Sequence, residues 1–120
     1  MSYSIEFEIM GLPKLPNQLL GRHWRSRAGH ASQWKDKVFM AIGRKRPDEA
    51  LPVARLTMTR FSSSSPDFDG LVGSFKSIVV ALVKLGILVN DKPSNIGCPT
   101  YLWEKTKQGA GKIKVKVESI

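Results

Sequence analysis

Apolar and polar side chains alternate along residues 3–10, which is the pattern of a β-strand with one buried face. Ile5, Phe7 and Ile9 are the apolar positions, and serine and glutamate stand between them. A glycine and a proline soon follow and end the pattern. We therefore predict that the chain begins with a strand whose apolar side chains enter the core.

Between residues 71 and 85 the apolar side chains recur at steps of three and four, which places them on one face of an α-helix. The repeating positions are Leu71, Phe75, Ile78, Leu82 and Leu85. Gly86 follows where a helix commonly ends. Three valines, Val72, Val79 and Val83, add apolar surface, which either pairs with a second copy or is buried under the sheet.

Two further elements precede that helix. Ser32 is in the position of an N-cap for a helix over residues 33–44, and Trp34 lies on its apolar side, where we expect it in the core. Residues 53–61 are rich in β-branched and apolar side chains and are predicted to form a second strand. The four serines at 62–65 fit a mobile loop better than a phosphate-binding one.

The C-terminal part predicts two more strands, over residues 96–106 and 112–118, with Gly109-Ala110-Gly111 between them as a hairpin turn. Three lysines alternate with the apolar residues of the last strand, and they either keep the sheet soluble or contact DNA. The order strand, helix, strand, helix, strand, strand predicts an α+β fold. We expect one domain over residues 1–120, with a mostly antiparallel or mixed sheet of about four strands and two α-helices.

The composition favours a polyanionic partner. Nineteen Lys and Arg residues against ten Asp and Glu give a net charge of +9 and a pI near 10.0, which suits nucleic acid but also an anionic membrane surface. No apolar run is long enough to span a membrane, and the N-terminal residues lack the pattern of a signal peptide. The single cysteine, Cys98, cannot form an internal disulfide, so we expect a cytoplasmic protein.

Residues 14–30 form a basic segment with little periodicity, which predicts irregular structure. Its candidate DNA-binding side chains are Asn17, Arg22, His23, Trp24, Arg25 and Arg27. Two interpretations fit: a solvated polar loop, or a phosphate-binding loop in which Trp24 stacks on an unpaired base. Asn17 either orients a phosphate or makes a turn.

Four charged residues around the second helix need a chemical explanation. Asp67 and Asp69 stand at its entry, and Lys76 follows two helical turns after Asp69 on roughly the same side. Asp91 comes in the loop after the helix. Individually, Asp69 is typical of an N-cap, Asp91 of a turn and Lys76 of a solvated helix surface. Together they suit phosphate chemistry, because Mg²⁺ is commonly held by one or two carboxylates, water and substrate phosphate.

Other chemistry has weaker signals. Phe68 lies between the first two acids, and it is either an anchor of the loop in the core or an exposed wedge at an unstacked base step. A zinc site made of His23, His30 and Cys98 has little support, since no paired cysteine or histidine spacing exists. No P-loop or dinucleotide fingerprint is present, so we expect no nucleotide cofactor.

One motif runs through the acidic region: Asp67-x-Asp69-x-Leu71, Lys76, Ala81-Leu82, Gly86 and Asp91. Near the start of the chain stand Ser4-Ile5, Leu15-Pro16-Asn17 and His23-Trp24. Over most of its length the chain thereby resembles the RusA-type Holliday junction resolvases (crossover junction endodeoxyribonucleases), chiefly their phage and prophage members. The family usually has Asn after its second acid, where this chain has Gly70.

The resemblance implies that Asp67, Asp69 and Asp91 bind Mg²⁺, with Mn²⁺ as a substitute, and that Lys76 is essential for cleavage. It implies branched DNA, in particular a four-way junction, as the substrate. A homodimer is the expected working form, because one acid cluster in 120 residues makes only one of two paired nicks. The rival interpretation is a basic DNA- or RNA-binding module without catalysis, in which the acids cap a helix.

Overall fold

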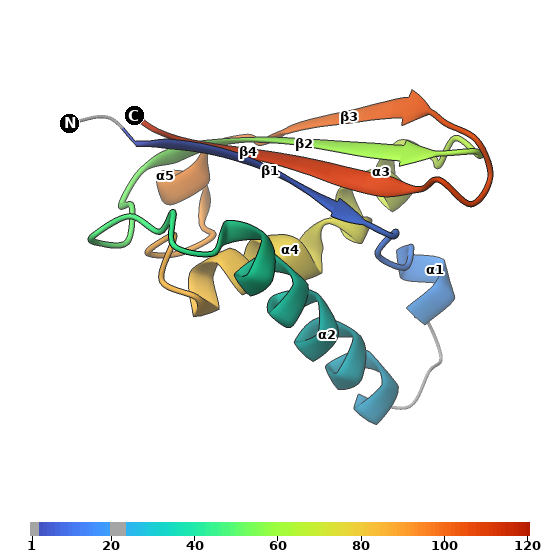
Figure 1. Cartoon of the computed structure of the whole chain (residues 1–120), viewed down its shortest axis with the longest axis horizontal. Helices are drawn as coiled ribbons and strands as arrows, with labels where there is room; N and C mark the ends of the chain where they lie inside the picture. The colour runs from blue at the N-terminus through green and yellow to red at the C-terminus, as the bar shows by residue number, and fades with distance from the viewer. Residues whose placement is uncertain (1–2, 20–23) are drawn as a thin grey trace.

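One mixed sheet of four strands forms the framework of the fold (Figure 1). Its strands are β1 (Ser4–Met10), β2 (Ala54–Ser62), β3 (Thr100–Lys105) and β4 (Lys112–Ser119), in the spatial order β1-β4-β2-β3. β4 runs antiparallel to both of its neighbours, whereas β2 and β3 are parallel. The computed structural model describes residues 3–19 and 24–120, and for residues 17, 19 and 24–26 it describes the backbone alone.

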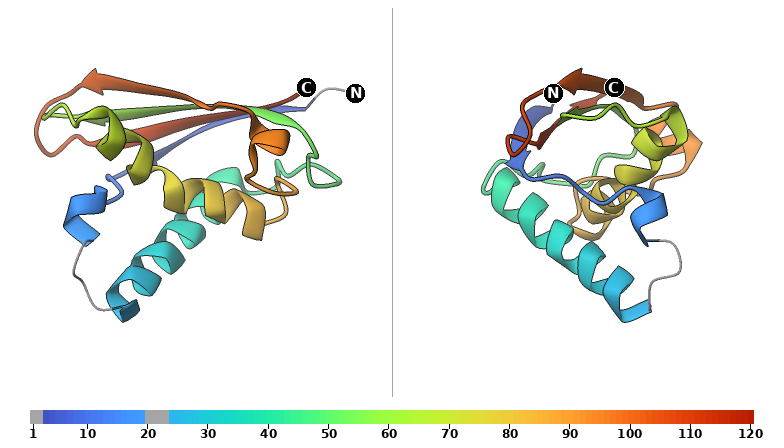
Figure 2. Two further views of the ribbon diagram at one scale, coloured as in Figure 1. Left: turned by 180° about the vertical axis from the view of Figure 1, so that it is seen from behind. Right: turned by 90° about the vertical axis from the view of Figure 1, so that its right-hand side faces the viewer.

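Five helices accompany the sheet in this described part of the chain: α1 (Pro16–Leu19), α2 (Trp24–Ile42), α3 (Phe68–Ser74), α4 (Lys76–Lys84) and α5 (Pro93–Ile96). α2 and α4 pack against each other beneath one face of the sheet (Figure 2). α3 and α4 belong to the crossover that joins β2 to β3, because parallel strands cannot be joined by a short turn. The prediction of an α+β fold with a four-stranded mixed sheet is therefore confirmed.

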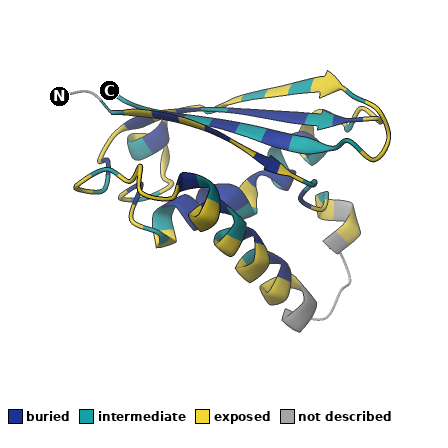
Figure 3. Ribbon diagram, viewed as in Figure 1, coloured by how far each residue is buried: buried dark blue, intermediate teal, exposed yellow. Residues whose placement is uncertain are grey.

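The core lies between the sheet and these two helices. β1 buries its predicted apolar side chains, and β4 buries Ile113, Val115 and Val117 in register beside them. Their alternation follows from strand geometry, which turns successive side chains to opposite faces. Trp34 on α2 is buried, as expected, while the outer side of α2 stays exposed (Figure 3).

Both predicted helices exist, but their extents differ from the prediction. α2 begins at Trp24, so Ser32 lies inside the helix and is not its N-cap. Residues 25–30 are mostly Arg, Ser, Gly and His, which show no apolar periodicity. The second predicted helix is two helices, α3 and α4, which meet at Phe75. Phe75 has φ −91° and ψ −1°, and its ring is fully buried, so the break coincides with a packed side chain.

β3 and β4 follow each other in sequence but are not neighbours, so the predicted hairpin between them is wrong. The chain does turn there: Gly109 has φ +86°, and the Ala110 N–H donates to the Lys107 carbonyl at 3.0 Å. The link passes the end of β2, which lies between the two strands (Figure 1). A glycine-rich turn reveals a chain reversal, whereas strand pairing depends on contacts between residues distant in sequence.

The lysines of β4 lie on the face of the sheet opposite α2 and α4, and they are paired with glutamates. Lys112 Nζ lies 3.3 Å from a Glu8 carboxylate oxygen, and Lys114 Nζ lies 3.3 Å from one of Glu6, both on β1. The third lysine of the row forms a pair at 3.9 Å within β4. Such exposed pairs contribute little stability, but they neutralise the row. This pairing favours the solubility interpretation over DNA contact.

α4 ends in a motif that requires glycine. Gly86 has φ +80°, and its N–H donates to the Val83 carbonyl at 3.1 Å. The next N–H, that of Ile87, donates to the Leu82 carbonyl at 2.9 Å. This pair of bonds defines the Schellman motif, in which the residue after the C-cap takes a left-handed conformation. Gly86 therefore ends the helix, as its position in the sequence predicted.

Gly86→Ala and Gly29→Ala are expected to change stability in opposite directions. Outside the local helix backbone, neither added methyl group would meet an atom within 4 Å, so backbone conformation decides the outcome. The left-handed φ at Gly86 costs an alanine about 1 kcal/mol. Inside α2, Gly29→Ala gains about 0.5–1 kcal/mol from helix propensity. Urea unfolding measures both differences, and equal signs would contradict this account.

Candidate functional site

Asp67 is the N-cap of α3. Its backbone is extended (φ −70°, ψ 169°), and its Oδ1 accepts a hydrogen bond from the Gly70 N–H at 2.7 Å. The interpretation of Asp69 as the cap is wrong, because Asp69 lies within the first turn. Phe68, the first helical residue, is exposed, so apolar periodicity placed the start of the helix too late.

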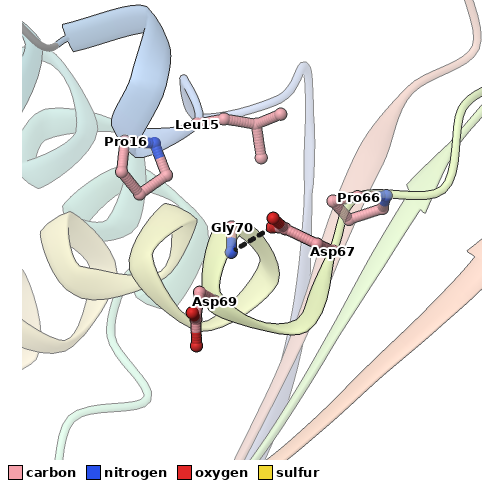
Figure 4. A pocket seen from close by; sticks show the side chains of 6 residues that line it. All are labelled: Leu15, Pro16, Pro66, Asp67, Asp69 and Gly70. Atoms are coloured by element: carbon pink, nitrogen blue, oxygen red, sulfur yellow. Dashed lines mark hydrogen bonds between the residues drawn. The ribbon is translucent and has the colours of Figure 1, made fainter.

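Asp67 and Asp69 line one pocket of about 440 Å³ (Figure 4). Its other lining residues are Leu15, Pro16, Pro66 and Gly70. The Asp67 carboxylate lies against Gly70, whereas that of Asp69 points away from it on another side of the helical turn (Figure 4). Both side chains are exposed, and neither forms an ion pair with a described residue. Each acid therefore keeps carboxylate oxygens free for a cation.

Two glycines allow the chain to approach α3 closely and so shape this pocket. A Cβ atom on Gly70 would lie 2.6 Å from Asp67 Oδ1, and one on Gly73 would overlap the Pro16 ring. A larger residue at position 70 would displace the capping carboxylate, and one at position 73 would push α1 away from α3. The glycine at position 70, where the resembling family usually has Asn, is thus tied to the position of Asp67.

Lys76 and Asp91 line a second pocket, of about 320 Å³, which also includes the second turn of α3. Lys76 is the first residue of α4; it is exposed and forms no ion pair with a described residue. Asp91 follows a segment that is fixed to the core, because Leu88 forms a parallel β-bridge with Leu51 ahead of β2. Because residues of α3 line both pockets, the two pockets lie along the same helix.

The four predicted site residues come together around α3 as two pairs. Within residues 3–19 and 24–120, no three Asp, Glu, His or Cys side chains are close enough to hold a metal ion together. Asp91 shares a pocket with Lys76 and not with the other two acids. Asp67 and Asp69 each remain available to Mg²⁺, which needs only one or two protein carboxylates when water and phosphate complete its coordination.

The predicted DNA-binding residues of the basic segment fall largely in helices. Asn17 belongs to α1, and Trp24 and Arg25 belong to the start of α2, where the backbone alone is described. Arg22 and His23 lie outside the described residues. The prediction of irregular structure is therefore wrong for α1 and for the segment from Trp24 onward, because a polar helix shows no apolar periodicity.

Two of the predicted DNA-binding side chains are described, and both are exposed. Arg27 lies on the surface of α2. Phe68 is 69% exposed, so the interpretation of this side chain as a core anchor is wrong. For the zinc interpretation, His30 is buried whereas Cys98 is exposed, and they belong to no metal-binding group among the described residues.

His30 supports the wall of the first pocket. It is 9% exposed, and its Nε2 accepts a hydrogen bond at 3.1 Å from the N–H of Lys14, the residue before Leu15. The proton therefore sits on Nδ1, which faces the Ser77 hydroxyl at 3.5 Å. Burial, followed by the ammonium groups of Lys14 and Lys37, lowers the pKa of His30. The neutral ring thus links the loop of the pocket to α2 and α4.

Stability is expected to fall as the pH drops from about 7 to about 5, in part through His30. Because its folded-state pKa is lowered, the unfolded chain binds this proton more readily, and folding loses free energy below the ordinary value of 6.5. His30→Gln should weaken this pH dependence, whereas His23→Gln, which leaves His30 in place, should retain it. Urea unfolding across this pH range measures the effect, and an unchanged profile in His30→Gln would contradict it.

Two residues that shape the site were not predicted from the sequence. Arg60 on β2 is 6% exposed, and its Nη1 donates to the Pro13 carbonyl at 2.8 Å, which fixes the loop before α1. Tyr101 on β3 lines the second pocket together with Lys76. The sequence signal for Arg60 was an arginine at a core-facing position of a predicted strand. No sequence signal pointed to Tyr101.

No protein-family model matches the chain, and no curated protein matches it. Among the described residues, no helix combines the length and the apolar character needed to cross a membrane.

Proposed function

We propose that this protein is a Mg²⁺-dependent endodeoxyribonuclease that resolves four-way DNA junctions by paired nicks. The observation that carries the proposal is the pair of exposed carboxylates, Asp67 and Asp69, in one pocket of a chain with net charge +9. Lys76 and Asp91, in the next pocket along α3, add a cation and a third acid. The likeness of these positions to the RusA-type motif supports the same activity.

In this proposal the chain's own groups bind the metal and stabilise the transition state. Asp69 and the Asp67 oxygen that is not used for capping would hold Mg²⁺. A metal ion held there would supply Lewis-acid chemistry at the scissile phosphate and hydroxide at neutral pH. Lys76 neutralises charge that develops on the phosphate or the leaving oxygen. Asp91 is the third proposed ligand, and its separate pocket makes Asp91→Asn the direct test of its contribution.

A second candidate is a basic DNA- or RNA-binding module without catalysis. Two observations favour it: Asp67 is used as an N-cap, and the described acids form no group of three that could hold a metal. In that case the acids stabilise α3, and the basic segment and exposed side chains such as Arg27 and Phe68 bind the nucleic acid.

Chelation distinguishes the two candidates. One purified sample is incubated with a four-way junction, a duplex and a flap, each with Mg²⁺, with Mn²⁺ and with EDTA. The nuclease should cut the junction only with a metal ion and should still bind it in EDTA, because chelation leaves the basic surface intact. A binding module should leave all three DNAs uncut and bind equally with and without the chelator.

The nuclease proposal includes a homodimer acting in the cytoplasm, because paired nicks need two sites and the junction has two-fold symmetry. Val79 and Val83 are poor candidates for its interface, since Val79 is buried and Val83 packs against the core. Met10 and Met40 are 65% and 77% exposed and line one groove between β1 and α2, so this face is the better candidate. Sedimentation at micromolar concentration tests the mass.

A further inference from the structure

Tyr101 is a third polar side chain in the pocket of Lys76 and Asp91. Ten residues line this pocket, and only these three have polar side chains; the others are glycine, proline and aliphatic residues. Tyr101 lies on β3, at one edge of the sheet, where its backbone pairs with Met58 of β2. The pocket therefore presents a bound group with one cation, one carboxylate and one phenol.

The Tyr101 hydroxyl has no hydrogen-bond partner among the described residues. The other tyrosine of the chain differs, since the Tyr3 hydroxyl donates to the Lys45 carbonyl at 2.6 Å. Tyr101 is half-buried, yet no described side chain has a buried polar atom without a partner, so solvent reaches the Tyr101 oxygen. A partly buried ring with an accessible hydroxyl is typical of tyrosines that bind a partner through their polar end.

The ring of Tyr101 is held in place by packing. Its centroid lies 6.2 Å from that of the Phe75 ring, with an interplanar angle of 42°. Phe75 is itself fully buried, and it directly precedes Lys76. Phe75 thus packs against the Tyr101 ring and also joins the start of α4, where Lys76 lies. A side chain fixed in this way loses little conformational entropy when a ligand binds.

At neutral pH the Tyr101 hydroxyl is a hydrogen-bond donor. Burial raises its pKa above the ordinary value, and the Coulombic effect of the nearby Cys98 raises it further. Phosphate oxygens accept hydrogen bonds from tyrosine, and Lys76 supplies positive charge in the same pocket. Asp91 repels an anion there, so a phosphate group needs Lys76 or a bound cation to balance that charge.

We propose that Tyr101 is a substrate-binding residue that donates its hydroxyl to a nonbridging oxygen of the DNA phosphate contacted by Lys76. This role rests on the proposed nuclease function and specifies how that site orients its substrate. Tyr101 stays neutral and transfers no proton. Loss of one hydrogen bond to a charged phosphate should weaken binding about 10-fold.

Tyr101→Phe and Tyr3→Phe are matched variants, because each removes one hydroxyl group. Tyr101→Phe should raise KM for the junction about 10-fold, change kcat less and keep native stability, because the Tyr101 hydroxyl makes no hydrogen bond to a described residue. Tyr3→Phe should lower stability through its bond to Lys45 and leave KM unchanged. A native KM in Tyr101→Phe, or a loss of stability as large as that of Tyr3→Phe, would overturn the proposal.

Junction binding in EDTA separates this proposal from that of the nuclease. Suppose that the native protein binds the junction but does not cut it with Mg²⁺, and that Tyr101→Phe binds about 10-fold more weakly. The phosphate contact of Tyr101 is then supported, and the nuclease function is contradicted. If the native protein cuts, and the variant equals it in cutting and binding, the Tyr101 proposal fails alone. A native protein that neither cuts nor binds a junction overturns both.

Discussion

Asp69→Asn is expected to lose Mg²⁺-dependent cleavage of a four-way junction by about 100-fold or more, because it removes one metal-binding charge. Binding of the junction should survive or improve, since the variant loses a negative charge and keeps every cation. Folding should change little, because Asp67 and not Asp69 caps α3. Gel assays of cleavage with Mg²⁺ and of binding in EDTA measure the two effects separately.

Asp48→Asn is the matched control for this variant. Asp48 is exposed in the connector before β2, and its replacement changes the net charge by the same amount. Asp67→Asn extends the test, because asparagine can still accept the hydrogen bond from the Gly70 N–H and so keeps the cap while it loses the charge. Near-native Mg²⁺-dependent cutting by Asp69→Asn would rule out the metal assignment.

Lys76→Ala is expected to reduce cleavage by about 100- to 1,000-fold, the usual effect of removing one group that stabilises transition-state charge. Lys76→Arg should be impaired as well, because a planar guanidinium replaces a compact ammonium. Stability should stay near native, since Lys76 is exposed and has no ion-pair partner among the described residues. Single-turnover cleavage with Mg²⁺ measures the loss in the chemical step.

Lys84→Ala provides the comparison on the same helix. Lys84 lies in the last turn of α4, is exposed and carries the same charge, but it does not line the pocket that holds Lys76 and Asp91. Its loss should weaken DNA binding slightly at most and leave the rate of cleavage unchanged. If Lys84→Ala loses cleavage while Lys76→Ala cuts at near the native rate, the lysine has been misassigned.

The candidate site was only partly predictable from the sequence. Asp67 and Asp69 are two residues apart, so any local structure places them near one another, and they do line one pocket. The helix start decides which of the two acids caps α3. Apolar periodicity did not reveal that start, because the first helical residue, Phe68, is exposed. Asp91 lies far along the chain, and its grouping with Lys76 followed from the packing of the intervening segment.

The sequence by itself determined the elements whose signals are local. Alternation in β1 and β4, the apolar face that continues through α3 and α4, and the stop at Gly86 all reflect backbone geometry that repeats every two or 3.6 residues. These patterns were sufficient to predict an α+β fold with a four-stranded sheet.

Only the tertiary structure decided which elements are neighbours and which side chains share a pocket. It placed β2 between β3 and β4, set the buried Arg60 against the Pro13 carbonyl and brought Tyr101 and Lys76 into the lining of one pocket. Each of these arrangements involves residues at least 25 positions apart in sequence, as the residue numbers show. Local periodicity cannot encode such contacts, because they depend on how the buried faces of separate elements pack together.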